Sequence, residues 1–362
     1  MPNYDALLLV SFGGPEGPDD VIPFLERVLT GRRVPRERMM EVAEHYHHFG
    51  GVSPINGQNR ALISALEVAL ETRGLSLPVY WGNRNWHPLL SDTVGRMSAD
   101  GIRRALAFVT SPYSSWSNCR QYLENIEEAR RDAGSDAPVI EKIRPFFNHP
   151  GFIETMAARV RSAMDRLPEE RRPGAHLVYT AHSIPLAMAG GCAYEAQLRE
   201  ASRLISERVG ASSWALTFQS RSGPPAQPWL EPDVCDYIRS FHETAAVRMA
   251  RADAAARAAN VDATHETAAA DQADRDLVVI PVGFISDHME VAYDLDVEAR
   301  ACCDELGVRM VRAETAGTHP RFVDMIVELV EERLSPSAAR PAVGVLGSWP
   351  DRCPPDCCPL GR

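Results

Sequence analysis

Residues 279–300, VIPVGFISDHMEVAYDLDVEAR, contain a strand, a turn and a charged helix in immediate succession. The apolar run Leu277–Val282 is typical of a buried parallel strand. Gly283 and Ser286 mark the turn, and Ser286 or Asp287 can cap the helix that follows. This order of elements predicts an α/β protein with a site at the end of a strand.

Three acidic residues recur at intervals of four on that helix, namely Glu290, Asp294 and Glu298. At 1.5 Å per residue they form an acidic ridge about 12 Å long, and successive side chains are rotated by only about 40°. Like charges at this spacing repel one another, and Arg300 is the nearest cation in the sequence. The pattern fits either a solvated acidic face or a functional row of carboxylates, and its place after a strand favours the second reading.

The composition describes a soluble globular protein of 362 residues, with 45% hydrophobic and 24% charged residues. Its net charge of −11 argues against nucleic acid as the main partner, because phosphate binding needs a basic surface. No apolar run reaches the roughly 18 residues that a transmembrane helix needs. The run Ala6–Val10 is also too short for a signal peptide, so we expect a cytoplasmic protein.

Strand patterns alternate with helical patterns along the chain, which predicts parallel sheets built from βαβ units. Because the carboxyl ends of parallel strands face one crevice, residues that follow the strands are expected to converge there. They are Phe12, Tyr113, His182, Gln219 and Glu290.

The chain divides into three parts on composition. A polar, arginine-rich break at Glu169–Pro173 separates a first domain, residues 1–172, from a second, residues 173–336. Residues 244–275 are rich in alanine and short of large apolar side chains, and are expected to form an insertion in the second domain. Residues 337–362 form a cysteine-rich tail.

Six motifs, in this order, resemble the ferrochelatases, which insert ferrous iron into a porphyrin. The motifs are LVSFGGPEGPDDVIPFL (9–25), HFGGVSPIN (48–56), TSPYSS (110–115), TAHSIP (180–185), TFQSRSGPPAQPWLEPDV (217–234) and PVGFISDHMEVAYDLD (281–296). The resemblance implies two Rossmann-like domains, each a parallel sheet flanked by helices. A porphyrin would bind between them, and the last helix, Pro320–Leu334, would pack back on the first domain.

The resemblance also implies roles for individual residues. His182 and Glu290 match the catalytic pair of the family, and an imidazole facing a carboxylate can both hold a divalent ion weakly and accept a pyrrole proton. Asp294 and Glu298 match the outer acidic positions, so His182, Glu290, Asp294 and Glu298 form the expected path for iron and protons.

The porphyrin would be held by apolar walls and by donors to its propionates. Phe12 stands where related bacterial enzymes often carry tyrosine, and His45 stands where the family has an arginine. Arg32 or Arg33 is expected to help bind propionates. Coproporphyrin III is the favoured substrate and protoporphyrin IX the alternative; a cobalt or nickel chelatase and a non-catalytic haem carrier are less favoured. The expected porphyrin contacts are Phe12, Tyr46, Ser53, Ile55, Tyr113, Tyr122 and Trp229.

Three cysteines, Cys353, Cys357 and Cys358, crowd the tail. Some ferrochelatases bind a 2Fe–2S cluster through three C-terminal cysteines and an internal one, for which Cys192 is the expected fourth ligand. Four thiolates could equally hold zinc. The remaining cysteines are interpreted as buried thiols, with the pair at 302 and 303 as an alternative source of a ligand; they are Cys119, Cys235, Cys302 and Cys303.

Overall fold

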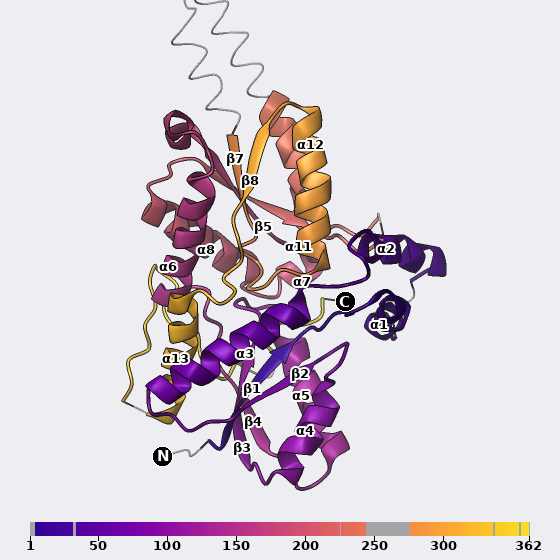
Figure 1. Ribbon diagram of the computed structural model, residues 1–362, viewed down its shortest axis with the longest axis vertical. Helices are drawn as coiled ribbons and strands as arrows, with labels where there is room; N and C mark the ends of the chain where they lie inside the picture. Colours follow the sequence, from indigo (N-terminus) through magenta and orange to yellow (C-terminus); the bar gives the residue numbers. More distant parts are fainter. Residues whose placement is uncertain are drawn as a thin grey trace, which may run out of the picture.

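The computed structural model describes residues 4–31, 34–224, 226–243, 276–335, 337–354 and 356–361 (Figure 1). The predicted alanine-rich insertion at 244–275 and the candidate propionate ligands Arg32 and Arg33 lie outside the described residues.

The first sheet has four parallel strands in the order β2-β1-β3-β4. Its central strand is the apolar run at the start of the chain, whose six residues are all buried. In the register, Leu8 pairs with Tyr80 of β2 and with Ala107 of β3. The strands are β1 (Ala6–Ser11), β2 (Val79–Asn83), β3 (Arg104–Val109) and β4 (Val139–Lys142).

The second sheet repeats this arrangement in the order β6-β5-β7-β8, again with all strands parallel. The predicted α/β fold of two Rossmann-like units is therefore confirmed. In each sheet the order in which strands are added reverses at one point, between β1 and β3 in the first sheet and between β5 and β7 in the second. These are topological switch points, where α/β proteins place their ligands. The strands are β5 (His176–His182), β6 (Trp214–Gln219), β7 (Asp276–Ile280) and β8 (Arg309–Arg312).

Helices cover both sheets, and one of them, α13, has the bounds that the resemblance implies. The segment between Arg36 and Ala99 contains three helices for which the sequence analysis has no prediction. The helices are α1 (Val21–Val28), α2 (Arg36–His48), α3 (Ile55–Thr72), α4 (Leu90–Ala99), α5 (Gln121–Ala133), α6 (Pro150–Met164), α7 (Leu186–Ala189), α8 (Tyr194–Val209), α11 (Met289–Tyr293), α12 (Arg300–Glu305) and α13 (Pro320–Leu334), with 3₁₀ turns η1 (Pro18–Asp20) and η3 (Glu169–Gly174) and π turns η2 (Trp116–Arg120) and η4 (Asp294–Ala299).

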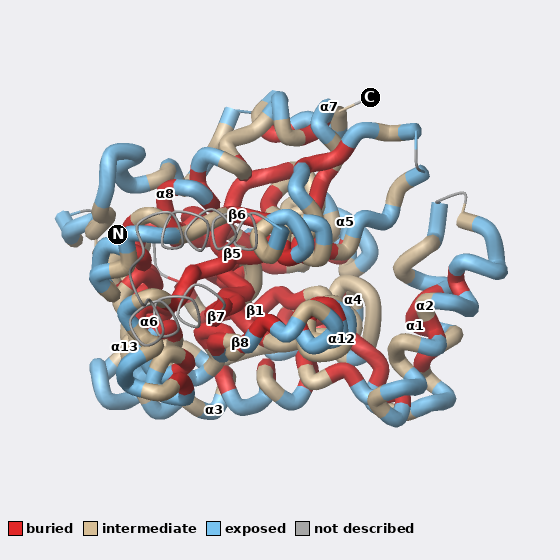
Figure 2. The backbone as a smooth tube through the Cα atoms, turned by 90° about the horizontal axis from the view of Figure 1, so that it is seen from above, coloured by how far each residue is buried: buried red, intermediate tan, exposed pale blue. Residues whose placement is uncertain are grey.

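One apolar core runs through both sheets, which lie at the centre of the molecule (Figure 2). It joins Leu7 and Phe108 of the first sheet to Tyr179 of the second and to Phe322 of α13. Helix α13 packs against α3 and α6, and α6 also contacts α8 and the second sheet. The domain boundary at residue 172 stays a prediction. None of the described helices is long and apolar enough to cross a membrane.

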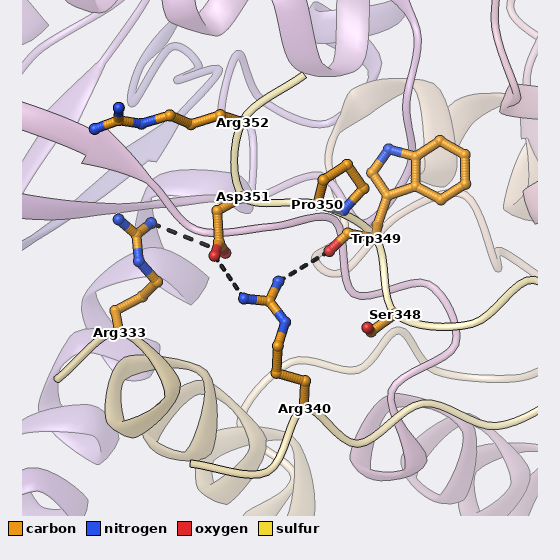
Figure 3. A pocket seen from close by; sticks show the side chains of 7 residues that line it. All are labelled: Arg333, Arg340, Ser348, Trp349, Pro350, Asp351 and Arg352. Atoms are coloured by element: carbon orange, nitrogen blue, oxygen red, sulfur yellow. Dashed lines mark hydrogen bonds and ion pairs between the residues drawn. The ribbon is translucent and has the colours of Figure 1, made fainter. Parts of the chain in front are cut away.

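After α13 the tail crosses the seam between the two halves. The Asn148 side chain donates to the carbonyls of Val343 and Gly347, and the backbone N–H of Val345 donates to Glu200 Oε1 at 2.6 Å. A pocket of about 470 Å³ lies where the tail meets the end of α13; there Arg340 and Arg333 point at Asp351 (Figure 3).

Candidate active site

His182 is the last residue of β5, beside the second switch point. Its Nδ1 hydrogen-bonds the carbonyl oxygen of Ser183. A carbonyl oxygen only accepts, so Nδ1 carries the proton and the neutral ring presents a lone pair at Nε2. That Nε2 lies 3.7 Å from Oε1 of Glu290. The side chains of His182 and Glu290 are 29% and 45% exposed, so solvent reaches both.

The acidic ridge follows β7, and β6 supports it from the side. Gln219 ends β6 and donates from Nε2 to the carbonyl of Glu290 at 2.9 Å and to Oδ2 of Asp294 at 3.4 Å. The hydroxyl of Ser220 also donates to Asp294. Glu298, at the far end, is exposed. The ridge therefore leads from the half-buried pair at His182 outward to solvent.

The helix that carries the acidic ridge changes type at Asp294, which the sequence does not predict. Glu290 lies in α11, whereas Asp294 and Glu298 lie in the π turn η4. A step of four residues is slightly more than one turn of an α-helix but less than one turn of a wider π-helix. The side chain of Asp294 is therefore rotated from that of Glu290 in one sense, and that of Glu298 is rotated from Asp294 in the opposite sense. From this geometry we expect the three carboxylates to stay on one side of the helix.

The beginning of this helix differs from the prediction. His288 occupies the N-cap position and no side chain caps the helix. The carboxylate of Asp287, expected as a cap, instead pairs with Arg312 of β8 at 3.1 Å. Arg312 thus brings a second cation to this segment from a neighbouring strand, besides Arg300, the nearest one in the sequence.

Neighbouring charges shift the proton affinities of these groups. Burial lowers the pKa of His182. The carboxylate of Glu290, the Ser183 carbonyl and Asp294 raise it by more than burial lowers it, so the pKa is raised overall. Burial, together with the charges of Glu290 and Glu298, raises the pKa of Asp294 to about 7. Burial also raises the pKa of Glu298. With its pKa raised to about 7, Asp294 can change protonation near neutral pH more readily than an isolated aspartate.

Helix α2 lies against the ridge. The buried hydroxyl of Tyr46 has a raised pKa because of burial and because Glu290 and Asp294 are near. The ring of His45 stacks on Tyr293, with centroids 3.7 Å apart and planes 7° from parallel. Tyr46, predicted as a propionate ligand, thus faces the acidic ridge; its contact with a porphyrin stays a prediction.

Two other predicted porphyrin contacts share a cation. Arg84, in the turn after β2, stands 5.6 Å from the ring centre of Phe12 and 4.5 Å from that of Tyr122. Its Nε donates to Asn125 at 2.7 Å. The sequence analysis missed Arg84, although its place after a strand could have indicated it.

The remaining predicted contacts are buried in this structure. Tyr113 is 1% exposed and donates from its hydroxyl to the carbonyl of Val282 at 3.0 Å, which links the two halves behind the site. Ser53, Ile55 and Trp229 are also buried. Their direct contacts with a porphyrin stay predictions.

The structure brings the tail thiols to an internal cysteine that the sequence analysis set aside. Cys357 lies near Cys353 and Cys358 and helps to raise the pKa of both thiols. Cys119, beside α5, is close enough to raise the pKa of both, whereas Cys192 acts on Cys358 alone. Burial and these neighbours raise the pKa of Cys353 to about 11. Sequence separation hides such a contact, so no local pattern could have indicated it.

Across the described ranges, no three His, Cys, Asp or Glu side chains are grouped as a ready-made metal site.

The comparison with family models decides the family. The model named Ferrochelatase matches residues 4–251 and 259–334. The chain belongs to the ferrochelatase family. Ferrochelatases are lyases that insert metal into porphyrins, and the matched range contains His182 and the whole acidic ridge.

Several relatives resemble the chain over nearly its full length. A protein named ferrochelatase from Rhodopirellula baltica is 53% identical over 99% of this chain and 94% of its own length. Proteins named coproporphyrin III ferrochelatase from Streptomyces coelicolor and Nocardia farcinica are 46% and 48% identical, over 98% and 93% of this chain and 93% and 90% of their own lengths.

A solved structure supports the fold. SirB from Bacillus subtilis with Fe3+ superposes with a TM-score of 0.51 at 12% identity, over 91% of this chain and 95% of that chain. At this identity, the similarity between SirB and this chain concerns the fold alone.

Proposed function

We propose that this chain inserts Fe²⁺ into coproporphyrin III to give its iron complex in haem biosynthesis. The main support for this proposal is the catalytic pair: Nε2 of His182 lies 3.7 Å from Oε1 of Glu290, beside a switch point of the second sheet. The substrate rests on the relatives named coproporphyrin III ferrochelatase. Ferrous iron is a substrate here, not a resident metal.

Insertion releases two pyrrole protons as Fe²⁺ takes their place, so the site must supply bases. The Nε2 lone pair of His182 accepts a proton, and the carboxylates of Glu290 and Asp294 stabilise the imidazolium that results. Glu290 then passes protons along Asp294 to the exposed Glu298. The same oxygens exchange ligands with incoming iron, because carboxylates bind divalent ions and their ligand shells are easily rearranged.

The substrate choice is tested with the purified full chain, anaerobically, with Fe²⁺ and either coproporphyrin III or protoporphyrin IX. We expect a higher kcat/KM for coproporphyrin III. A higher kcat/KM for protoporphyrin IX would overturn the substrate assignment and leave the chelatase reaction intact.

For the tail we propose a 2Fe–2S cluster, with zinc as the alternative. The donor set fits in kind and number, since Cys357 and the internal Cys119 both act on Cys353 and on Cys358, which gives the four thiols that such a cluster needs. Cys119 is favoured over the expected Cys192 because it acts on two tail thiols rather than one. A bound cluster would supply one-electron redox chemistry.

The absorption spectrum of the protein as isolated, with its iron, sulfide and zinc contents, tests this proposal. We expect visible absorption that Cys119→Ser and Cys358→Ser remove and that Cys235→Ser, a free thiol elsewhere in the chain, retains. Retention in Cys119→Ser and loss in Cys192→Ser would restore Cys192 as the ligand. A colourless, zinc-containing protein would contradict the cluster. A cytoplasmic location stays a prediction, and we further propose transient contacts with neighbouring haem-pathway enzymes.

A further inference from the structure

Arg312, at the end of β8, binds two acidic residues of the segment that carries the acidic ridge. Its Nε lies 2.7 Å from Oδ1 of Asp296, and its Nη1 and Nη2 lie 3.1 and 3.4 Å from the two carboxylate oxygens of Asp287. Asp287 precedes Glu290, and Asp296 lies between Asp294 and Glu298. We infer that Arg312 is a positioning residue for metal insertion, which fixes the acidic ridge against His182 by holding the segment at both sides.

The geometry separates two sets of carboxylates on one short segment. Glu290 and Asp294 are the ridge members near His182, whereas Asp287 and Asp296 turn to Arg312. The guanidinium therefore neutralises the two acids outside the ridge without taking up the oxygens proposed to exchange iron. The acids of the ridge keep their negative charge for the cation.

The segment has few other fixed points at its start. Helix α11 lacks a side-chain cap, and the backbone N–H of Asp287 donates to Oε1 of Gln58 on α3 at 2.8 Å. Arg312 and Gln58 thus hold the entry to the helix from two sides. The Arg312 side chain is only 16% exposed, so its ion pairs are shielded from solvent and hold the segment more firmly than surface pairs would.

Arginine suits this role better than lysine. A planar guanidinium can face two carboxylates at once with separate N–H groups, whereas an ammonium is a single point charge. Arg309, three residues earlier on the same strand, supplies a matched control. Its Nε lies 3.8 Å from Asp276 and its side chain is 49% exposed, and within the described part of the chain its ion pair is with Asp276 and not with the ridge.

The inference rests on the proposed function, because it assigns its effect to Glu290 and Asp294. The test compares Arg312→Met, Arg312→Lys and Arg309→Met with the unchanged protein and with Glu290→Gln. The measurements are kcat, KM for Fe²⁺ and for coproporphyrin III, thermal unfolding, and amide hydrogen exchange over residues 288–299.

We expect Arg312→Met to lower kcat by up to about 100-fold, the size of effect that a misplacement of about 1 Å produces. KM for the porphyrin should stay unchanged, since Arg312 touches none of its predicted contacts, and exchange over residues 288–299 should become faster. The kcat of Arg312→Lys should lie between those of Arg312→Met and the unchanged protein. Arg309→Met should have the kcat and the amide exchange of the unchanged protein. Adding Asp296→Asn to Arg312→Met should cause little further loss, because both act through one contact.

An unchanged kcat in Arg312→Met, with Glu290→Gln inactive, would overturn the inference and leave the proposed function standing. Full activity in Glu290→Gln would instead overturn the proposed function. If Arg312→Met does not fold, Asp296→Asn and Arg312→Lys carry the test; normal kcat and normal hydrogen exchange in both would overturn the inference.

Discussion

Ser220 has a backbone φ of +61°, in the left-handed region that non-glycine residues avoid. Such a conformation costs about 1–3 kcal/mol and persists where the surroundings impose it. Here it follows β6 directly and brings the Ser220 hydroxyl onto the carboxylate of Asp294. The hydrogen bond lowers the pKa of Asp294, against burial and the neighbouring charges that raise it to about 7. One hydroxyl thus helps to keep Asp294 ionised at neutral pH.

This balance predicts a pH-dependent affinity for iron. Asp294 binds a cation only when ionised, so KM for Fe²⁺ should fall as the pH rises through about 7. Ser220→Ala should move that transition to higher pH, because the hydroxyl that stabilises the ionised form is lost. Asp294→Asn should abolish the transition. The control Ser222→Ala changes an exposed serine of the same loop; a transition at the same pH in Ser220→Ala and Ser222→Ala would contradict the prediction.

Among the elements, α2 is attached through a small area. It packs on α1 and touches α11, and both α1 and α2 lie at one side of the molecule (Figure 1). The stack of His45 on Tyr293 is a principal contact between α2 and the ridge segment. Aromatic pairs contribute about 0.5–1.5 kcal/mol beyond the area they bury.

Removal of that stack should loosen α2 without disturbing the sheets. We expect Tyr293→Ala to speed amide exchange over Arg36–His48 by roughly two- to tenfold, the rate equivalent of the lost energy. Amides of β5 should keep their protection. Tyr293→Phe retains the ring and should behave like the unchanged protein. Equal exchange over α2 in both variants would show that the stack contributes nothing to its attachment.

The elements that the sequence predicts well are those whose signal is local. Strand β1 is an unbroken buried run. Helix α13 was expected from the family resemblance, and in the structure it buries an apolar stripe that reaches Val330. Helix α2 was missed because only Met39 and Ala43 of its residues are buried, which leaves almost no apolar period. The polar sequence of α2 therefore resembles that of a loop.

The site shows the same limit. The motif around His182 and the spacing of Glu290 and Asp294 stand in the sequence, and the structure brings the three together. The pairing of Asp287 with Arg312 cannot be read from the sequence, because it joins a loop to a strand that only the folded structure brings close. The change to a π turn at Asp294 is also invisible, since it depends on which carbonyl each N–H selects.

At the scale of the whole molecule, a buried ion pair crosses the seam near the tail. Arg144 follows β4 and Glu332 lies on α13, their side chains are 0% and 2% exposed, and two hydrogen bonds of 2.8 Å join them. Removing one partner leaves an unpaired buried charge, which costs more than the pair contributes.

We therefore expect Glu332→Gln or Arg144→Met to lower the free energy of unfolding in urea by about 3–5 kcal/mol. The double variant Arg144→Met with Glu332→Leu should recover much of that loss, because no charge is left without a partner. Arg73→Met removes a largely exposed pair with Glu331 on the same helix and should cost about 1 kcal/mol or less. Additive losses in the double variant would contradict this account.

The central claim is that His182 and Glu290 together insert the iron. Its most direct test is a single-turnover measurement of Fe²⁺ insertion into enzyme-bound coproporphyrin III for the unchanged protein, Glu290→Gln and Glu305→Gln, an exposed carboxylate on α12. We expect Glu290→Gln to bind the porphyrin normally and to insert iron about 10²–10⁴-fold more slowly, the usual contribution of a positioned base. Glu305→Gln should match the unchanged protein. Insertion at the unchanged rate in Glu290→Gln would contradict the account.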